Sequence, residues 1–178
     1  VAEVFDPTTG AWSPAGEMDE KRVDHTATLM NDGRVLVVGG GDSATKFNSV
    51  EIYDPDVGRW VGGPAVGRWT TVGPMGMGRA EHGAILLEDG RVRVVGGRNH
   101  AFADQFSDAF TTVFLSTAEL YDPSSRQWSQ TDPMIVKRGG PQLVLLEDGN
   151  VMAIGGRGIA EDEDGRRKQV YRATTEIY

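Results

Sequence analysis

The sequence HTATLMNDGRVLVVGG at residues 25–40 decides the fold, because two further copies of it follow along the chain. They are HGAILLEDGRVRVVGG at 82–97 and PQLVLLEDGNVMAIGG at 141–156. In each copy an Asp-Gly dipeptide joins two short apolar runs, a pattern that favours a tight β-hairpin. Each copy ends in a glycine pair, where absent side chains allow close backbone approach. The pairs are Gly39 and Gly40, Gly96 and Gly97, and Gly155 and Gly156. The chain is therefore predicted to be a β-repeat protein.

A second block, with an aromatic residue, Asp-Pro and a tryptophan, alternates with the first. Its copies are AEVFDPTTGAW at 2–12, VEIYDPDVGRW at 50–60 and AELYDPSSRQW at 118–128. We expect a third strand that ends at the proline, which lacks an N–H group, and a fourth that carries the tryptophan. The repeated aromatic residues Tyr53, Tyr121, Trp12, Trp60 and Trp128 are predicted to pack in the blade cores, between neighbouring sheets. Because VGRW occurs at both 57–60 and 66–69, Trp69 is an alternative to Trp60.

Four short strands in a unit of roughly 40–50 residues correspond to one blade of a β-propeller. The order of DG, VVGG, YDP and W resembles the kelch repeat and is similar to the form in bacterial kelch-type proteins. The resemblance implies an all-β, kelch-type β-propeller with four-stranded antiparallel blades. The predicted organisation is the end of a blade at 1–18, blades at 19–75 and 76–134, and an incomplete blade at 135–178.

Such a number of blades does not close a ring, which needs about four to eight. We therefore expect an incomplete ring in this chain, completed by the remaining blades of the same propeller or by a second copy of the chain. The start at Val1 and the last repeat, TEIY at 175–178, favour a segment of a six- or seven-bladed domain. A six-bladed ring of two copies is the alternative.

The composition argues against several classes of function. The net charge of −8 opposes binding to nucleic acid, and no apolar run is long enough for membrane insertion. Without cysteine, the chain forms no disulfide and no thiolate metal site. No acid–base pair or nucleophile stands out, so we expect no catalytic residue, no metal and no cofactor.

Strand order places the irregular connections on one face of the predicted propeller. These connections are 41–50, 61–80, 98–116 and 157–173, whereas the opposite face carries the uniform Asp-Gly turns. The duplicated VGRW segment is assigned to a connection between blades on the irregular face. Because function concentrates in loops on a rigid scaffold, we expect this face to bind a protein or a carbohydrate.

Two connections contain the candidate binding residues. In 98–115, phenylalanines recur every four residues, which predicts a short helix that either packs on a blade or anchors a partner. Arg98 and Arg157 each follow a glycine pair, and either pair with nearby acidic side chains or face the channel mouth to bind a carboxylate or sulfate. The segment Glu161–Asp164 is expected to be a solvated charged loop. The candidates are Arg98, His100, Phe102, Phe106, Arg157 and Arg166.

The residues that recur in two or three units are assigned structural roles, because a catalytic group is rarely needed several times. They are Arg22, Arg79 and Arg138, together with the paired histidines His25 and His82. Since the repeated residues all have structural explanations, the main hypothesis is a binding module, as the kelch resemblance also implies. The alternative is part of a propeller enzyme such as a galactose-oxidase-like carbohydrate oxidase. Its copper site requires a cysteine-linked tyrosine, so the absence of cysteine disfavours it.

The expected location rests on the same resemblance. Bacterial kelch-type proteins with this repeat are often exported, which implies an extracellular or periplasmic protein. A chain without cysteine is also stable in a reducing compartment, so a cytoplasmic location is compatible with the composition.

Overall fold

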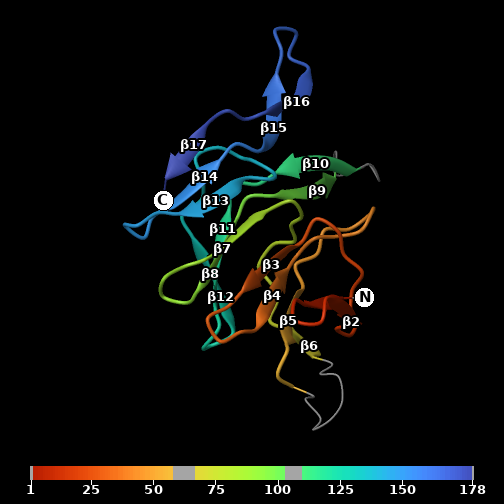
Figure 1. Cartoon of the computed structure of the whole chain (residues 1–178). Helices are drawn as coiled ribbons and strands as arrows, with labels where there is room; N and C mark the ends of the chain where they lie inside the picture. Colours follow the sequence, from red (N-terminus) through yellow and green to blue (C-terminus); the bar gives the residue numbers. More distant parts are fainter. Residues whose placement is uncertain (1, 58–66, 103–109, 178) are drawn as a thin grey trace.

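Antiparallel β-sheets make up the structure, a computed structural model that describes residues 2–57, 67–102 and 110–177 (Figure 1). The first complete sheet has the order β3 (Thr26–Leu29), β4 (Val35–Val38), β5 (Val50–Asp54) and β6 (Arg68–Val72). The second has the order β7 (Gly83–Leu86), β8 (Val92–Val95), β11 (Ala118–Asp122) and β12 (Gln127–Thr131). No helix in the described residues could cross a membrane.

Two partial sheets and two extra hairpins complete the structure. The partial sheets are β1 (Glu3–Asp6) with β2 (Ala11–Pro14), and β13 (Gln142–Leu145) with β14 (Val151–Ile154) and β17 (Thr175–Ile177). The hairpins are β9 (Arg98–Phe102) with β10 (Phe110–Phe114), and β15 (Arg157–Glu161) with β16 (Arg167–Tyr171). The sheets form no closed ring in the described residues. The two complete sheets confirm the predicted all-β architecture with four-stranded antiparallel blades.

Neighbouring sheets pack through their apolar faces. The innermost strand β7 contacts both β3 and β13, so three sheets meet around the same axis. Between the two complete sheets lies a cluster of fully buried side chains. It includes Leu36, Val38, Val50, Ile52, Val92, Val94 and Tyr121. Alternation along each strand directs these side chains to the sheet interfaces, and their burial is the main force that holds sheet to sheet.

The repeated tryptophans join each sheet to the unit before it. The Trp69 ring lies 5.2 Å from the Tyr53 ring, and its Nε1 donates a 2.8 Å hydrogen bond to the carbonyl of Ala15. Trp128 makes the equivalent bond, 2.9 Å long, to the carbonyl of Gly73. Trp69 therefore holds the repeat position, and Trp60 lies outside the described residues. Trp12 departs from the prediction of a buried residue, because it is 65% exposed. Its equivalents bond to the preceding unit, and none precedes Trp12 in this sequence.

The prediction for the duplicated VGRW segment was wrong. Tyr53 pairs with Trp69 and Asp54 with Arg68, so the second VGRW copy enters strand β6. The extra residues consequently fall between β5 and β6 rather than between blades. This connection starts beside Val35, at the end of the sheet that carries the Asp-Gly turns. Of the predicted loop 61–80, only the part after β6 belongs to the irregular face.

The predicted helix over 98–115 was also wrong. Arg98 pairs with Phe114 and Phe102 with Phe110, so the segment is a β-hairpin. The β-branched run Thr111–Val113 favours a strand, and the spacing of the phenylalanines does not override this pairing. Phe114 is buried, and Phe106 lies outside the described residues. Figure 1 shows both extra hairpins in the upper half of the view and β5 and β6 in the lower half.

Candidate functional site

Beneath the irregular face lies a layer of buried arginine–glutamate pairs. Arg79 is fully buried and donates through Nη1 to the carbonyl oxygens of Gly96, at 2.8 Å, and Thr117, at 3.0 Å. Its Nη2 lies 2.6 Å from Oε1 of Glu119. The second carboxylate oxygen accepts a 2.7 Å hydrogen bond from the N–H of Gly76. Each arginine thus fastens the connector between two sheets to the third strand and the glycine pair.

The same pair recurs in the other two units. Arg22 Nη2 lies 2.6 Å from Glu51, and Arg138 pairs with Glu176. Burial lowers the pKa of Arg79, and Glu119 opposes that shift. The arginines were predicted to be structural, but the sequence reasoning missed their glutamate partners. The signal was present, because each glutamate stands two residues before the repeated tyrosine.

The glycine pairs receive the connector of the next unit. The N–H of Gly97 donates a 2.9 Å hydrogen bond to the carbonyl of Arg138. A Cβ on Gly96, whose φ is 64°, would lie only 2.6 Å from that same carbonyl oxygen. Side chains are therefore excluded from the first glycine by both backbone conformation and close approach.

Of the two equivalent histidines, His82 lies at a sheet interface, whereas His25 is exposed. His82 is buried, and its Nε2 lies 2.8 Å from the hydroxyl of Thr26 on the neighbouring sheet. Burial, with a smaller contribution from the positive charge of Arg79, lowers the pKa of His82 to about 3. The side chain is therefore neutral near pH 7. The described residues contain no group of three or more His, Cys, Asp or Glu able to hold a metal ion.

Alternating charges lie at the end of the inner strands β3, β7 and β13 on the irregular face, a position called the channel mouth below. Arg98 donates through Nε to Glu81, at 2.9 Å, and through Nη2 to Asp24, at 3.1 Å. Arg157 pairs with the other carboxylate oxygen of Glu81. Of the two alternatives for these arginines, the structure has the pairing with acidic side chains. Asp24 and Glu81 occupy equivalent positions, with φ values of 57° and 51°, and Gly140 stands there in the next unit.

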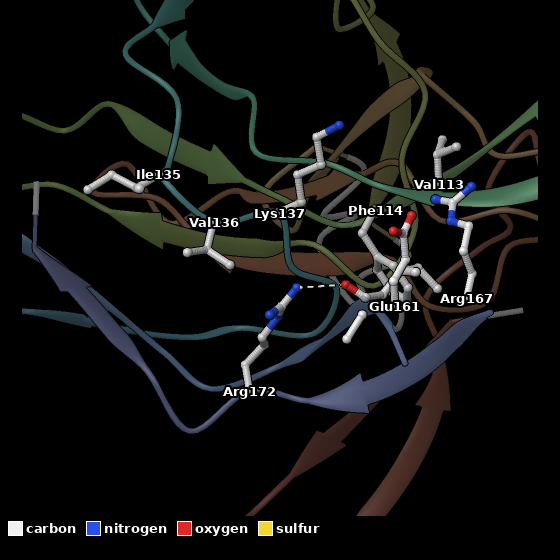
Figure 2. Close-up of a pocket in the computed structure, with 10 residues that line it drawn as sticks. Val113, Phe114, Ile135, Val136, Lys137, Glu161, Arg167 and Arg172 are labelled. Atoms are coloured by element: carbon white, nitrogen blue, oxygen red, sulfur yellow. Dashed lines mark hydrogen bonds between the residues drawn. The ribbon is translucent and has the colours of Figure 1, made fainter. Parts of the chain in front are cut away.

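A groove of about 570 Å³ lies on the irregular face. Figure 2 shows it between the β9–β10 hairpin, the β15–β16 hairpin and the connector at 135–137. Its apolar lining comes from Val113, Phe114, Ile135, Val136, Ile159 and Ala160. Ile135 is 91% exposed, which is unusual for so apolar a side chain, so the groove offers apolar surface to solvent.

The same groove concentrates positive charge on an acidic chain. Lys137, Arg167 and Arg172 line it, and none of them forms an ion pair with a described residue. Glu161 is the one carboxylate that lines the groove in the described part of the chain. Arg172 reaches across β15 and donates a 3.1 Å hydrogen bond through Nη2 to the carbonyl of Ile159 (Figure 2). The groove is therefore suited to a ligand with both negative and apolar groups.

A second hollow, of about 280 Å³, lies next to the groove on the channel side. Phe114 and Ile159 line both, so they form a wall between the two. The remaining lining is polar and comes from Glu81, Arg98, Thr112, Arg157 and Gln169. Because Glu81 neutralises part of the positive charge of the two arginines, this hollow is less cationic than the groove.

The structure separates the six predicted binding residues. Arg98 and Arg157 line the second hollow, and His100 lies beside them in β9, where burial lowers its pKa. Phe102 ends the same strand, whereas Phe106 lies outside the described residues. Arg166 is 80% exposed at the tip of the β15–β16 hairpin and does not line the groove. The sequence reasoning missed the three cationic residues that do, Lys137, Arg167 and Arg172.

Comparison with known proteins places these features in a family context. The kelch motif model matches residues 22–76. The chain is 25% identical to beta-scruin of Limulus polyphemus over 167 residues, which cover 90% of this chain and 16% of that protein. It is 30% identical to N-acetylneuraminate epimerase of Brucella suis over 128 residues, which cover 70% of this chain and 29% of the epimerase. The chain thus spans less than a third of the length of either relative.

A solved structure supports the fold. The structure of YjhT superimposes with a TM-score of 0.67 at 16% identity, over 99% of this chain and 51% of that one. At this level of identity the likeness concerns the arrangement of the blades alone.

Proposed function

We propose that this chain, which belongs to the kelch-repeat β-propellers, is a binding module that holds an acidic segment of a partner protein in the groove between its two extra hairpins. The observation that carries the proposal is that three cationic side chains, which form no ion pair within the described part of the chain, meet an exposed apolar lining. The propeller supplies rigid sheets, and the two hairpins rise from them to form the walls.

Charge complementarity favours an acidic ligand. The chain as a whole carries a charge of −8, so most of its surface repels a negative segment. Lys137, Arg167 and Arg172 gather positive charge within the groove, which Glu161 offsets only in part. An arginine guanidinium binds a carboxylate through two parallel hydrogen bonds, while the apolar lining accepts neighbouring apolar side chains. The ligand proposed is therefore a peptide segment that contains both carboxylates and apolar residues.

An immobilised array of ten-residue peptides tests this proposal. We expect the bound peptides to be enriched in Asp and Glu next to apolar residues, with weaker binding at high salt. The double variant Arg167→Gln with Arg172→Gln is expected to lose this binding. Arg166→Gln, which removes an adjacent charge outside the groove, is the matched control and should bind as the parent does. Enrichment in basic peptides, or no binding at all, would contradict the proposal.

A carbohydrate is the second candidate ligand, and the similarity to N-acetylneuraminate epimerase favours it. N-acetylneuraminate is a sugar with a carboxylate, and the second hollow offers two arginines, a threonine hydroxyl and a glutamine amide. Titration with N-acetylneuraminate, followed by calorimetry, tests this alternative. Binding that is abolished by Arg98→Ala with Arg157→Ala supports it, whereas a silent titration counts against it.

A further inference from the structure

The guanidinium of Arg172 occupies space that a side chain at position 158 would fill. Gly158 lies in β15 and pairs with Val170 of β16. Arg172 follows Val170 by two residues, so it is a diagonal neighbour of Gly158. A Cβ on Gly158 would lie 2.5 Å from Nε of Arg172, 2.6 Å from Nη2 and 2.8 Å from Cζ. All three of these nearest atoms belong to the arginine side chain. Gly158 lacks the positive φ that favours glycine, so its backbone conformation accepts other residues.

Arg172 is held in place while most of its hydrogen-bonding capacity stays unused. In the described part of the chain, its guanidinium makes the Nη2 bond to the carbonyl of Ile159 and no ion pair. Its Nε is buried without a hydrogen-bond partner among those residues. A buried donor without an acceptor costs free energy. The side chain also lines the groove, as Figure 2 shows.

We propose that Gly158 is a specificity-determining position of the groove: its missing side chain makes room for the Arg172 guanidinium, which is thereby presented to a carboxylate of the ligand. The identity of the ligand in this inference rests on the proposed function. The positioning of the Arg172 guanidinium by Gly158 rests on the geometry of β15 alone. Gly158 is a positioning residue, since it acts through Arg172 and touches no ligand. A residue with a side chain at position 158 displaces the guanidinium and leaves the net charge of the groove unchanged.

Binding of a labelled ten-residue peptide of alternating Glu and Leu, measured by fluorescence anisotropy, tests the mechanism. Arg172→Gln is expected to weaken binding about tenfold or more, the effect of losing one charge-assisted contact. Gly158→Ala should weaken binding by a similar factor although it removes no charge. Gly73→Ala is the matched control, because a Cβ there meets only one atom, at 3.5 Å, and binding should stay within about twofold. Normal binding by Gly158→Ala, combined with loss in Arg172→Gln, would overturn the inference.

The position of the guanidinium is measurable without a ligand. The Nε–H resonance of Arg172, assigned as the one absent from the spectrum of Arg172→Gln, should shift in Gly158→Ala and stay unchanged in Gly73→Ala. An unchanged resonance in Gly158→Ala overturns the inference whatever the peptide does. Failure of the unsubstituted chain to bind the peptide would instead count against the proposed function, and the resonance would still decide the role of Gly158.

Discussion

The two ends of the sheets differ in how far their repeats diverge. At one end, the turns of all three units close in the same way. Asp32, Asp89 and Asp148 each accept, through Oδ1, a 3.0–3.1 Å hydrogen bond from the N–H two residues later. At the other end, the first unit has an irregular loop, whereas the next two have the β9–β10 and β15–β16 hairpins. The same blade scaffold thus carries constant chemistry at one end and variable chemistry at the other, which is where a ligand would be distinguished.

The variable end contains two layers of charged residues, a buried deep layer and an outer layer at the channel mouth. The buried arginine–glutamate pairs are the same in every unit, while the channel-mouth positions change from Asp24 to Glu81 to Gly140. If the deep layer holds the sheets together and the outer layer carries function, substitutions in the deep layer should cost stability. Those in the outer layer should affect binding with little loss of stability.

The largest expected effect is in the deep layer. Arg79→Met leaves the carboxylate of Glu119 buried without its partner, which should lower the free energy of unfolding by about 3–5 kcal/mol. Adding Glu119→Leu removes the stranded charge and should recover a large part of the loss. Urea unfolding of both variants measures this. A loss below about 1 kcal/mol for Arg79→Met would mean that the pair does not hold the connector.

Two glycines compare the ends of the sheets directly. Both Gly96 and Gly33 have positive φ, but a Cβ on Gly96 meets the Arg138 carbonyl, whereas one on Gly33 meets nothing within 4 Å. Gly96→Ala should therefore destabilise the protein by about 3 kcal/mol, and Gly33→Ala by about 1 kcal/mol, the cost of the backbone conformation alone. Equal losses in thermal or urea unfolding would show that close approach at the glycine pair contributes nothing.

The third effect depends on pH, because burial holds the pKa of His82 far below its value of 6.5 in the unfolded chain. Below pH 6.5 the unfolded chain binds a proton that the folded chain refuses until about pH 3, so stability falls as the pH is lowered through this window. Between pH 7 and pH 5 the unsubstituted chain should lose about 2 kcal/mol more than His82→Gln. Parallel pH profiles of the two proteins would contradict the buried, neutral state of this histidine.

The smallest effect is expected at the channel mouth. Glu81→Gln breaks two partly exposed ion pairs, with Arg98 and Arg157, and should cost about 1 kcal/mol. Asp24→Asn breaks one more exposed pair and should cost less than about 0.5 kcal/mol. Urea unfolding at low and high salt measures both losses of stability. The loss of each variant relative to the unsubstituted chain should shrink as salt is added. A loss of stability as large as that of Arg79→Met would contradict the distinction between the deep layer and the outer layer.

The sequence predicts what is local and repeated. Asp-Gly between two apolar runs specifies a hairpin within a few residues, so the blades and their strand order follow from the repeats. The spacing of the phenylalanines suits a helix, yet the pairing of β9 with β10 and a β-branched run decide for a hairpin. Duplication left Trp60 and Trp69 equivalent in sequence, and only the register with Tyr53 distinguishes them.

The candidate site was less predictable, because its residues come from separate segments. Lys137 lies on a connector, Arg167 in β16 and Arg172 after that strand, and no motif links them. Arg166 was chosen in place of Arg167, although neighbours on a strand face opposite sides and only one of them lines the groove. The role of Gly158 depends on a contact with Arg172 that has no sequence signature.

Hydrogen exchange with and without a saturating acidic, apolar peptide is the most direct test of the division between the two ends. We predict slower amide exchange in β10, β15, β16 and residues 135–137, which surround the groove. The amides of the Asp-Gly turns at 31–34, 88–91 and 147–150 should exchange as in the free protein. Protection concentrated at those turns, with the hairpins unaffected, would contradict the assignment of binding to the variable end.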